Sequence, residues 1–170
     1  LAKLVDLANK IENYLDKNLN VISGGATTSL PLLLDGEMPE KINNLRIGEA
    51  ILLGRDMKEL WGYDFPGIRQ DTFKLKAEVI ELKVKPSKPY GEVFVDAFGN
   101  KPFFEDRGKR KRAILGIGKA DFVYPDQLIP VHKEIEILGA SSDHLLLDVE
   151  DMNGILQVGD IIEFELFYGP

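Results

Sequence analysis

The pattern of hydrophobic and polar residues changes near residue 71. Over 1–15 the apolar residues recur every three or four positions, which predicts an amphipathic helix. From 73 to 85 apolar and charged residues alternate instead, which is the period of a β-strand with one exposed face. The pattern therefore predicts a helical part followed by a β part.

The first part predicts the order helix, strand, helix, strand. A short buried strand, Val21–Ile22, leads into Ser23–Ser29, whose last hydroxyl residues offer N-caps to a helix starting near Pro31. A second short strand is expected at 45–48, followed by an apolar continuation at 49–53. This order is typical of a βα barrel or another parallel α/β layer, although two such units are too few to close a barrel.

The second part predicts a small antiparallel β domain. Val79 and Ile80 are adjacent where the alternation slips, which indicates a β-bulge. Further strands are expected at 93–95, 113–115, 134–138, 145–149 and 161–167, with turns at 98–101, 139, 153–154 and 159–160. The segment 55–70 has no periodicity and predicts a functional loop or linker.

Composition limits the function classes. The chain has 170 residues, 44% of them hydrophobic, which is enough for a proper core. A net charge of -7 argues against a nucleic-acid or membrane surface, and the short basic cluster Arg107–Arg112 is expected to be a solvated hairpin flank. The absence of cysteine excludes disulfides and thiolate chemistry and fits a cytoplasmic location. Because the chain starts without Met inside a helical pattern, Leu1 is not expected to be the natural start.

Two features suggest anion chemistry. Small and hydroxyl residues in Ser23–Ser29 let the backbone approach a phosphate, although an ordinary strand-to-helix turn has the same composition. Arg46 lies between two apolar residues and needs an acceptor, which is either a ligand or a structural salt bridge. The histidines at 132 and 144 match no metal-ligand spacing, so no metal is expected.

The order of the motifs resembles the alanine racemase family of pyridoxal-phosphate enzymes, and within it the branch that includes ornithine racemase. The similar features are the small-residue turn, the string Leu45–Ala50 and the β domain after them. Ile117–Asp121 resembles the family's glycine-tyrosine-alanine-aspartate segment. Gly139–Val149 resembles its methionine-aspartate-glutamine segment. The likeness spans nearly the whole chain, and it implies an α+β fold in which the end of a TIM-type (β/α) barrel precedes the antiparallel β domain.

The resemblance implies a set of cofactor-binding residues: Ser23, Gly25, Thr27, Thr28, Arg46, Gly48 and Glu49. Thr27 and the backbone of Gly48 and Glu49 would hold the phosphate of pyridoxal phosphate. Arg46 would face the pyridine nitrogen and keep it largely unprotonated, which weakens the ring as an electron sink. A short-lived carbanion suits racemisation better than transamination.

The chain departs from the family pattern in two places. The motif of the lysine that binds the cofactor covalently does not occur, and Lys88–Gly91 has the wrong spacing, so the isolated chain is expected to be inactive. Lys119 stands where the family places a catalytic tyrosine contributed across a dimer interface. It is either a base, if its surroundings favour the neutral amine, or a surface lysine. Ser142 and Asp143 would bind the substrate, or they form a capped turn.

The sequence is accordingly predicted to be the C-terminal part of an amino-acid racemase. Its expected regions are barrel elements at 1–55, a linker at 56–72 and the β domain at 73–170. The expected partners are a free amino acid, with a basic one such as ornithine or lysine as the leading candidate, and a second copy in a homodimer. One alternative is a non-enzymatic β-barrel binding module, in which Arg46 and the Ser23 turn would be internally satisfied. A cofactor carrier without turnover is a third possibility, although such relatives usually lack the β domain.

Overall fold

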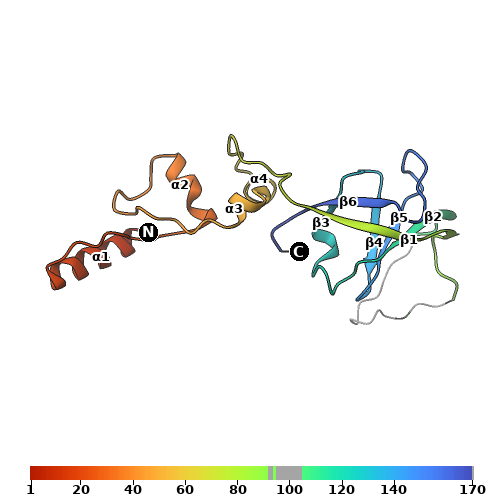
Figure 1. Cartoon of the computed structure of the whole chain (residues 1–170), viewed down its shortest axis with the longest axis horizontal. Helices are drawn as coiled ribbons and strands as arrows, with labels where there is room; N and C mark the ends of the chain where they lie inside the picture. Colours follow the sequence, from red (N-terminus) through yellow and green to blue (C-terminus); the bar gives the residue numbers. More distant parts are fainter. Residues whose placement is uncertain (92–93, 95–104, 170) are drawn as a thin grey trace. The chain divides into compact units, whose positions relative to one another are not determined.

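The chain forms two compact units, Leu1–Phe73 and Lys74–Pro170 (Figure 1). The structure, a computed structural model, describes residues 1–91, 94 and 105–169. The turn predicted at 98–101, and Val93 and Val95 of a predicted strand, lie outside the described residues. Within the described part, no helix is long and apolar enough to span a membrane.

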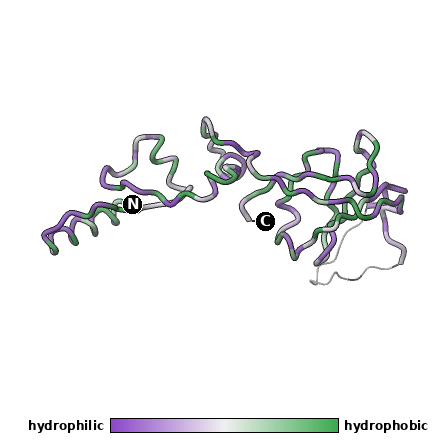
Figure 2. The backbone as a smooth tube through the Cα atoms, viewed as in Figure 1, coloured by the Kyte–Doolittle hydropathy of each residue, from purple (hydrophilic) through white to green (hydrophobic). Residues whose placement is uncertain are grey.

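The first unit begins with the predicted helix, α1 (Ala2–Leu15). Hydrophobic and hydrophilic residues follow each other along its turns (Figure 2). Ala8, on the apolar stripe, is buried with Ile22 and Ile42, and this small core anchors the helix to the segments that follow. Tyr14 lies outside this core and is exposed. The helix prediction is confirmed.

Two segments after α1 lie side by side and run in parallel. Ser23 and Asn44 form a parallel bridge, and the amides of Gly24 and Arg46 donate to Asn44 O at 3.0 Å and Gly25 O at 3.1 Å. The predicted order of strands and helices is therefore correct, but the strands shrink to this single bridge. Each segment has one described neighbour to pair with, and an isolated pair of strands is marginal.

A short helix follows each of these paired segments. The first segment continues into a 3-10 turn (Thr27–Ser29) and α2 (Leu30–Leu34), and the second into α3 (Glu49–Leu52). Pro31 lies in the first turn of α2, where its missing N–H removes no helical hydrogen bond. The N-caps predicted from the hydroxyls at 27–29 are not formed, because no side-chain cap bond is present at either helix start.

The segment predicted as an aperiodic loop contains a further helix, α4 (Arg55–Glu59). Its Met57 is only 1% exposed and packs with Leu30 and Ala50, and with half-buried residues that include Tyr63. The helix is short, with a single buried apolar position, and that is too little for a periodicity to register in the sequence. Burial of Met57 ties this segment into the first unit.

The second unit is a six-stranded antiparallel sheet with the order β3-β6-β1-β2-β5-β4, as the alternation predicted. Its strands are β1 (Lys74–Pro86), β2 (Lys109–Leu115), β3 (Leu128–Pro130), β4 (Glu136–Ala140), β5 (Leu145–Asp148) and β6 (Ile161–Leu166). The sequence did not predict β3, whose three residues include a proline at the sheet edge. Nor did it predict the 3-10 turn before β3, Pro125–Gln127.

Strand β1 pairs with a different strand on each side of the sheet, and its bulge lies near the point where one pairing ends and the other begins. Its register shifts between Val79 and Glu81, where the sequence predicted a β-bulge. The N-terminal half of β1 pairs with β6, and the remainder pairs with β2. Gly139, predicted as a turn, lies instead within β4 at a second register shift. The fully buried Leu115, Leu147 and Phe164 fill the core that the bent sheet encloses.

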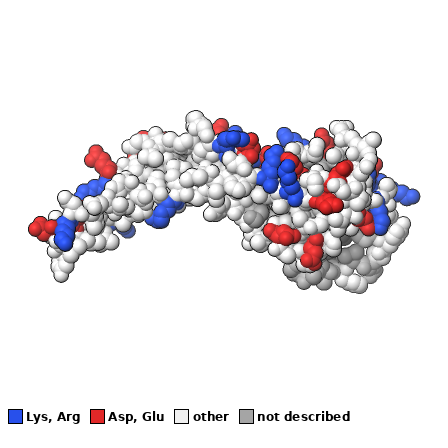
Figure 3. All heavy atoms as spheres, in the orientation of Figure 1, with Lys and Arg blue, Asp and Glu red and all other residues white. Residues whose placement is uncertain are grey.

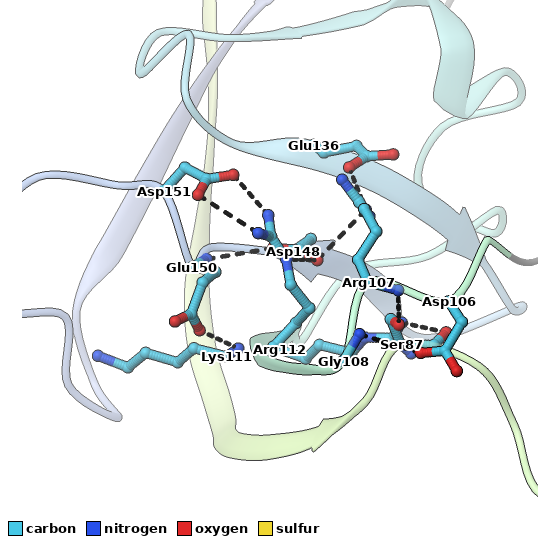
Figure 4. Close-up of polar contacts among 11 residues, drawn as sticks. Ser87, Asp106, Arg107, Gly108, Lys111, Arg112, Glu136, Asp148, Glu150 and Asp151 are labelled. Atoms are coloured by element: carbon cyan, nitrogen blue, oxygen red, sulfur yellow. Dashed lines mark hydrogen bonds and ion pairs between the residues drawn. The ribbon is translucent and has the colours of Figure 1, made fainter.

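Acidic and basic side chains are interspersed over the face of the second unit shown in Figure 3. The cluster Arg107–Arg112, predicted as a solvated flank, takes part in this mixed surface through β2. Arg107 reaches between Glu136 (2.6 Å) and Asp148 (3.5 Å) (Figure 4). Arg110 binds Asp148 through Nε at 3.0 Å and Asp151 through Nη2 at 2.5 Å. The basic run is therefore partly a structural ion network.

Asp148 is the buried centre of this network, with its side chain 1% exposed. Burial alone raises the pKa of Asp148. The hydrogen bond and positive charge of Arg110, together with the amide of Glu150, outweigh burial and hold this pKa below its usual value. The ionised carboxylate therefore stabilises the folded sheet.

We expect Asp148→Asn to lower the free energy of unfolding by roughly 2–4 kcal/mol at pH 7, because Arg110 loses its buried acceptor. Since the pKa of Asp148 is lowered in the fold, this contribution is present above about pH 4 and is lost as the pH falls through the folded pKa. Urea unfolding followed from pH 7 to pH 2 measures both effects. Asp151→Asn, at an exposed partner of Arg110, is the control and should cost less than about 1 kcal/mol. Equal losses would contradict the central role of Asp148.

Candidate cofactor and substrate site

The predicted site residues fall into two groups, one on each unit. The cofactor group lies on the two turns that follow the paired segments of the first unit, at residues 23–28 and 46–49. Gly25 has a φ of +93°, and a Cβ at this position would lie 2.6 Å from the Cβ of Ser29. Only glycine fits there, so the turn passes close to the start of the following helix.

Thr27 connects the two turns. Its side chain is buried, and Oγ1 accepts a hydrogen bond from the amide of Ala50 at 3.2 Å. The hydroxyl that was expected to cap the next helix therefore binds across to α3 instead. Its own hydrogen remains available to donate to a ligand.

Arg46 is held by the turn that precedes it in the chain. Its Nη1 donates to the hydroxyl of Ser23 at 2.7 Å and to the Ser23 carbonyl at 3.3 Å. The Ser23 hydroxyl donates in turn to Oδ1 of Asn44 at 2.7 Å. Arg46 is exposed and, within the described residues, pairs with no carboxylate, so the structural salt bridge that the sequence left open is not present. The remaining guanidinium N–H groups are free to bind an anion.

Several amides around these turns also lack acceptors. None of the described residues accepts a hydrogen bond from the amides of Thr28, Gly48 or Glu49. Together with the Thr27 hydroxyl and the Arg46 guanidinium, they form a set of donors from two adjacent turns. Such a set suits a phosphate dianion, which takes several N–H and O–H donors at once. The residues present therefore fit the phosphate of the implied cofactor.

The substrate group lies on the second unit, where two loops join. The amide of Lys119 donates to Ser141 O at 2.8 Å, and that of Ala120 donates to Ser142 O at 2.9 Å. Lys119 is half-buried next to this junction. The fold thus brings Lys119 and Ser142, which are 23 positions apart in the sequence, into neighbouring loops.

Gly118 permits this contact. A Cβ on Gly118 would overlap the backbone of Ser142 and Asp143, so the loops approach as closely as a bare backbone allows. Asp121 fixes the first loop, since its Oδ2 accepts from the Gly118 amide at 3.0 Å. The sequence did not single out Asp121 for this role. An aspartate three residues after a glycine is the available signal, because such side chains bond to nearby backbone amides.

Ser141 organises the second loop. Its Oγ accepts from the amide of His144 at 3.1 Å, and its own amide donates to His144 O at 2.8 Å. The capped turn that the sequence left open is therefore present, but the cap is Ser141. The predicted substrate residues Ser142 and Asp143 are exposed at the tip of the turn, and the Ser142 hydroxyl donates to the Asp143 carboxylate.

A cavity of about 530 Å³ adjoins this turn, with Ser141 and His144 among its lining residues. Ile114, Leu138 and Leu146 supply much of its apolar lining. Across the described residues, no group of three or more histidine and acidic side chains is placed to hold a metal ion.

Comparison with known proteins finds that the chain is similar to amino-acid racemases. No protein-family model matches it. It is 50% identical to the ornithine racemase of Acetoanaerobium sticklandii over 169 residues, 99% of this chain and 47% of the relative. It is 48% identical to the lysine racemase of Thermotoga maritima over 165 residues, 97% of this chain and 46% of the relative.

The fold matches as well. The crystal structure of the alanine racemase from Bartonella henselae with covalently bound pyridoxal phosphate has a TM-score of 0.56 and 16% identity, and the match covers 94% of this chain and 51% of that one. The resemblance that the sequence motifs predicted is therefore confirmed. Over nearly its whole length the chain is similar to ornithine and lysine racemases and has the fold of an alanine racemase, and it spans about half the length of the curated relatives it matches.

Proposed function

We propose that this chain supplies the C-terminal part of a pyridoxal-phosphate-dependent racemase that interconverts the L and D forms of an amino acid. The parallel pairing of the two turns in the first unit carries the proposal, because it gathers the donors that a cofactor phosphate requires. The names of the two racemase relatives favour a basic substrate such as ornithine or lysine.

Thr27, Thr28 and the amides of Gly48 and Glu49 would hold the cofactor phosphate. When bound, the cofactor would withdraw electrons from the α-carbon of an amino acid and so make its proton easier to remove. Arg46 would lie at the pyridine nitrogen, where a permanently charged guanidinium disfavours protonation of the ring. Ser23 would orient Arg46 through their 2.7 Å hydrogen bond and line the turn with Gly25.

The loops of the second unit would serve the substrate. Racemisation needs a proton removed on one face of the α-carbon and returned on the other, so two acid-base groups must flank it. Lys119 is proposed as one of them, acting in the active site of a second copy within a homodimer. The exposed Ser142 and Asp143 would bind polar groups of the substrate, and the Asp143 carboxylate suits an ammonium group.

The non-enzymatic alternative predicts that Arg46 and the Ser23 turn are internally satisfied. The Ser23 hydroxyl is bonded within the chain, to Arg46 and to Asn44. The exposed guanidinium, with one described nitrogen bound and no described carboxylate partner, argues against that alternative. The chain has no motif for the covalently binding lysine, so we propose that this half alone does not turn over substrate.

The first test is racemisation by the full-length protein that contains this chain. With added pyridoxal phosphate, we expect loss of optical rotation for at least one free amino acid, ornithine or lysine foremost, because both halves of the site are then present. Residues 1–170 alone are the control and should show no turnover. Intact optical rotation for every amino acid, with no bound-cofactor absorbance, would overturn the proposal.

Lys119→Ala in the full-length protein should separate the two directions of proton transfer. A lost acid-base group costs on the order of 10²–10⁴-fold in rate. We therefore expect α-proton exchange with deuterated solvent to slow mainly from one enantiomer. Lys133→Ala, at an exposed lysine, is the matched control and should leave both rates unchanged. Small and equal losses from both enantiomers would return Lys119 to a surface role.

Gly118→Ala should separate the two loops of the second unit. The added Cβ overlaps the backbone at 142–143, which cannot rotate away, so we expect a loss of roughly 1–3 kcal/mol in unfolding free energy and a higher KM. Gly116→Ala is the control, since its Cβ would meet only the Ile80 side chain at 3.3 Å. Urea unfolding and steady-state kinetics measure the two effects. Equal behaviour of the two variants would show that the close approach at Gly118 is unimportant.

A further inference from the structure

Glu49 has a buried carboxylate in a place where the backbone, and not the side chain, is assigned a role. It is the first residue of α3 and only 6% exposed. Burying a carboxylate is costly unless its oxygens are bound. Oε1 accepts from the amide of Asp56 at 3.0 Å, whereas Oε2 is buried with no hydrogen-bond partner among the described residues.

The bond to Asp56 makes Glu49 the cap of α4. The helix is preceded by Gly54, which has no side chain to bind the free amides of the first turn. An acceptor at the second amide is what an N-cap side chain normally supplies. The carboxylate of Glu49 performs this task from the preceding helix, and its charge suits the positive end of α4.

The main chain of Glu49 also bonds to this corner, which is the turn between α3 and α4. Its carbonyl accepts from Leu53 at 2.8 Å and from Gly54 at 2.9 Å. Gly54 has a φ of +61°, which lets the chain reverse between α3 and α4. Arg55, buried to the same extent, is the first residue of α4 and brings a positive charge into this corner. Glu49 is thus bonded to the corner through both its side chain and its backbone.

We propose that the Glu49 carboxylate is the positioning residue for the phosphate-binding amides of Gly48 and Glu49. By capping α4 it fixes the start of α3 and therefore the direction in which these amides point. This role rests on the proposed cofactor site, and it distinguishes the Glu49 side chain from its backbone.

The test measures phosphate recognition separately from ring binding. The full-length protein is titrated with 4′-deoxypyridoxine 5′-phosphate and with 4′-deoxypyridoxine, neither of which bonds covalently to a lysine. The dissociation constant of 4′-deoxypyridoxine, divided by that of its 5′-phosphate, reports what the phosphate contributes to binding. We expect Glu49→Ala to lower this ratio about tenfold, the size of one lost charge-assisted hydrogen bond. Glu49→Gln should restore it to within about threefold, because its amide oxygen still accepts from Asp56.

Met57→Ala is the matched control. It opens a cavity in the same small core and should lower the melting temperature at least as much as Glu49→Ala, but it should leave the ratio unchanged. If Glu49→Ala fails to fold, Glu49→Met fills a similar volume without an acceptor and serves the same comparison. An unchanged ratio in the Glu49 variants, or an equal fall in Met57→Ala, would overturn the positioning role. A wild-type protein without preference for the phosphorylated probe would overturn the cofactor site itself.

Discussion

The parallel pairing of residues 22–25 with 43–46 is the constraint on which the first unit depends. It is a small interaction, with one bridge and a few backbone hydrogen bonds. Because the segments run in the same direction, the two turns that follow them emerge on the same side. That arrangement lets Thr27 reach Ala50 and lets Arg46 reach back to Ser23. An antiparallel pairing of the same segments would separate these groups.

In the second unit, a contact between two loops positions the candidate residues, and not a pairing of parallel segments. Its sheet is held by the bulge in β1 and by a core of large aliphatic side chains, and its candidate residues lie on loops outside that core. The loops at 117–121 and 141–144 become one structure only because Gly118 lets two backbones touch. The side chains at the tips of these loops are then positioned by the contact between the two backbones.

Sequence patterns predicted what depends on periodicity and missed what depends on single contacts. The alternation across β1 gave both the strand and its bulge, since a two-residue period reveals any slip. Helix α4 and strand β3 are too short for a period to register. The ion network around Asp148 was not visible, because a run of basic residues looks the same in water and against a buried carboxylate. The resemblance gave the candidate site residues, whereas the roles of Ser141 and the Glu49 side chain are seen only in the hydrogen bonds of the structure.

Burial divides the polar groups of the candidate site into two kinds. Thr27 and Glu49 are buried, and each binds a backbone amide of a neighbouring helix, which offsets part of their cost of desolvation within the fold. Arg46, Ser142 and Asp143 are exposed, so water satisfies the groups that no protein atom binds. The exposed groups can exchange water for a ligand, whereas replacing a buried group disturbs the backbone first and binding as a consequence. Mutations at the two kinds of position should therefore differ in whether stability or affinity changes first.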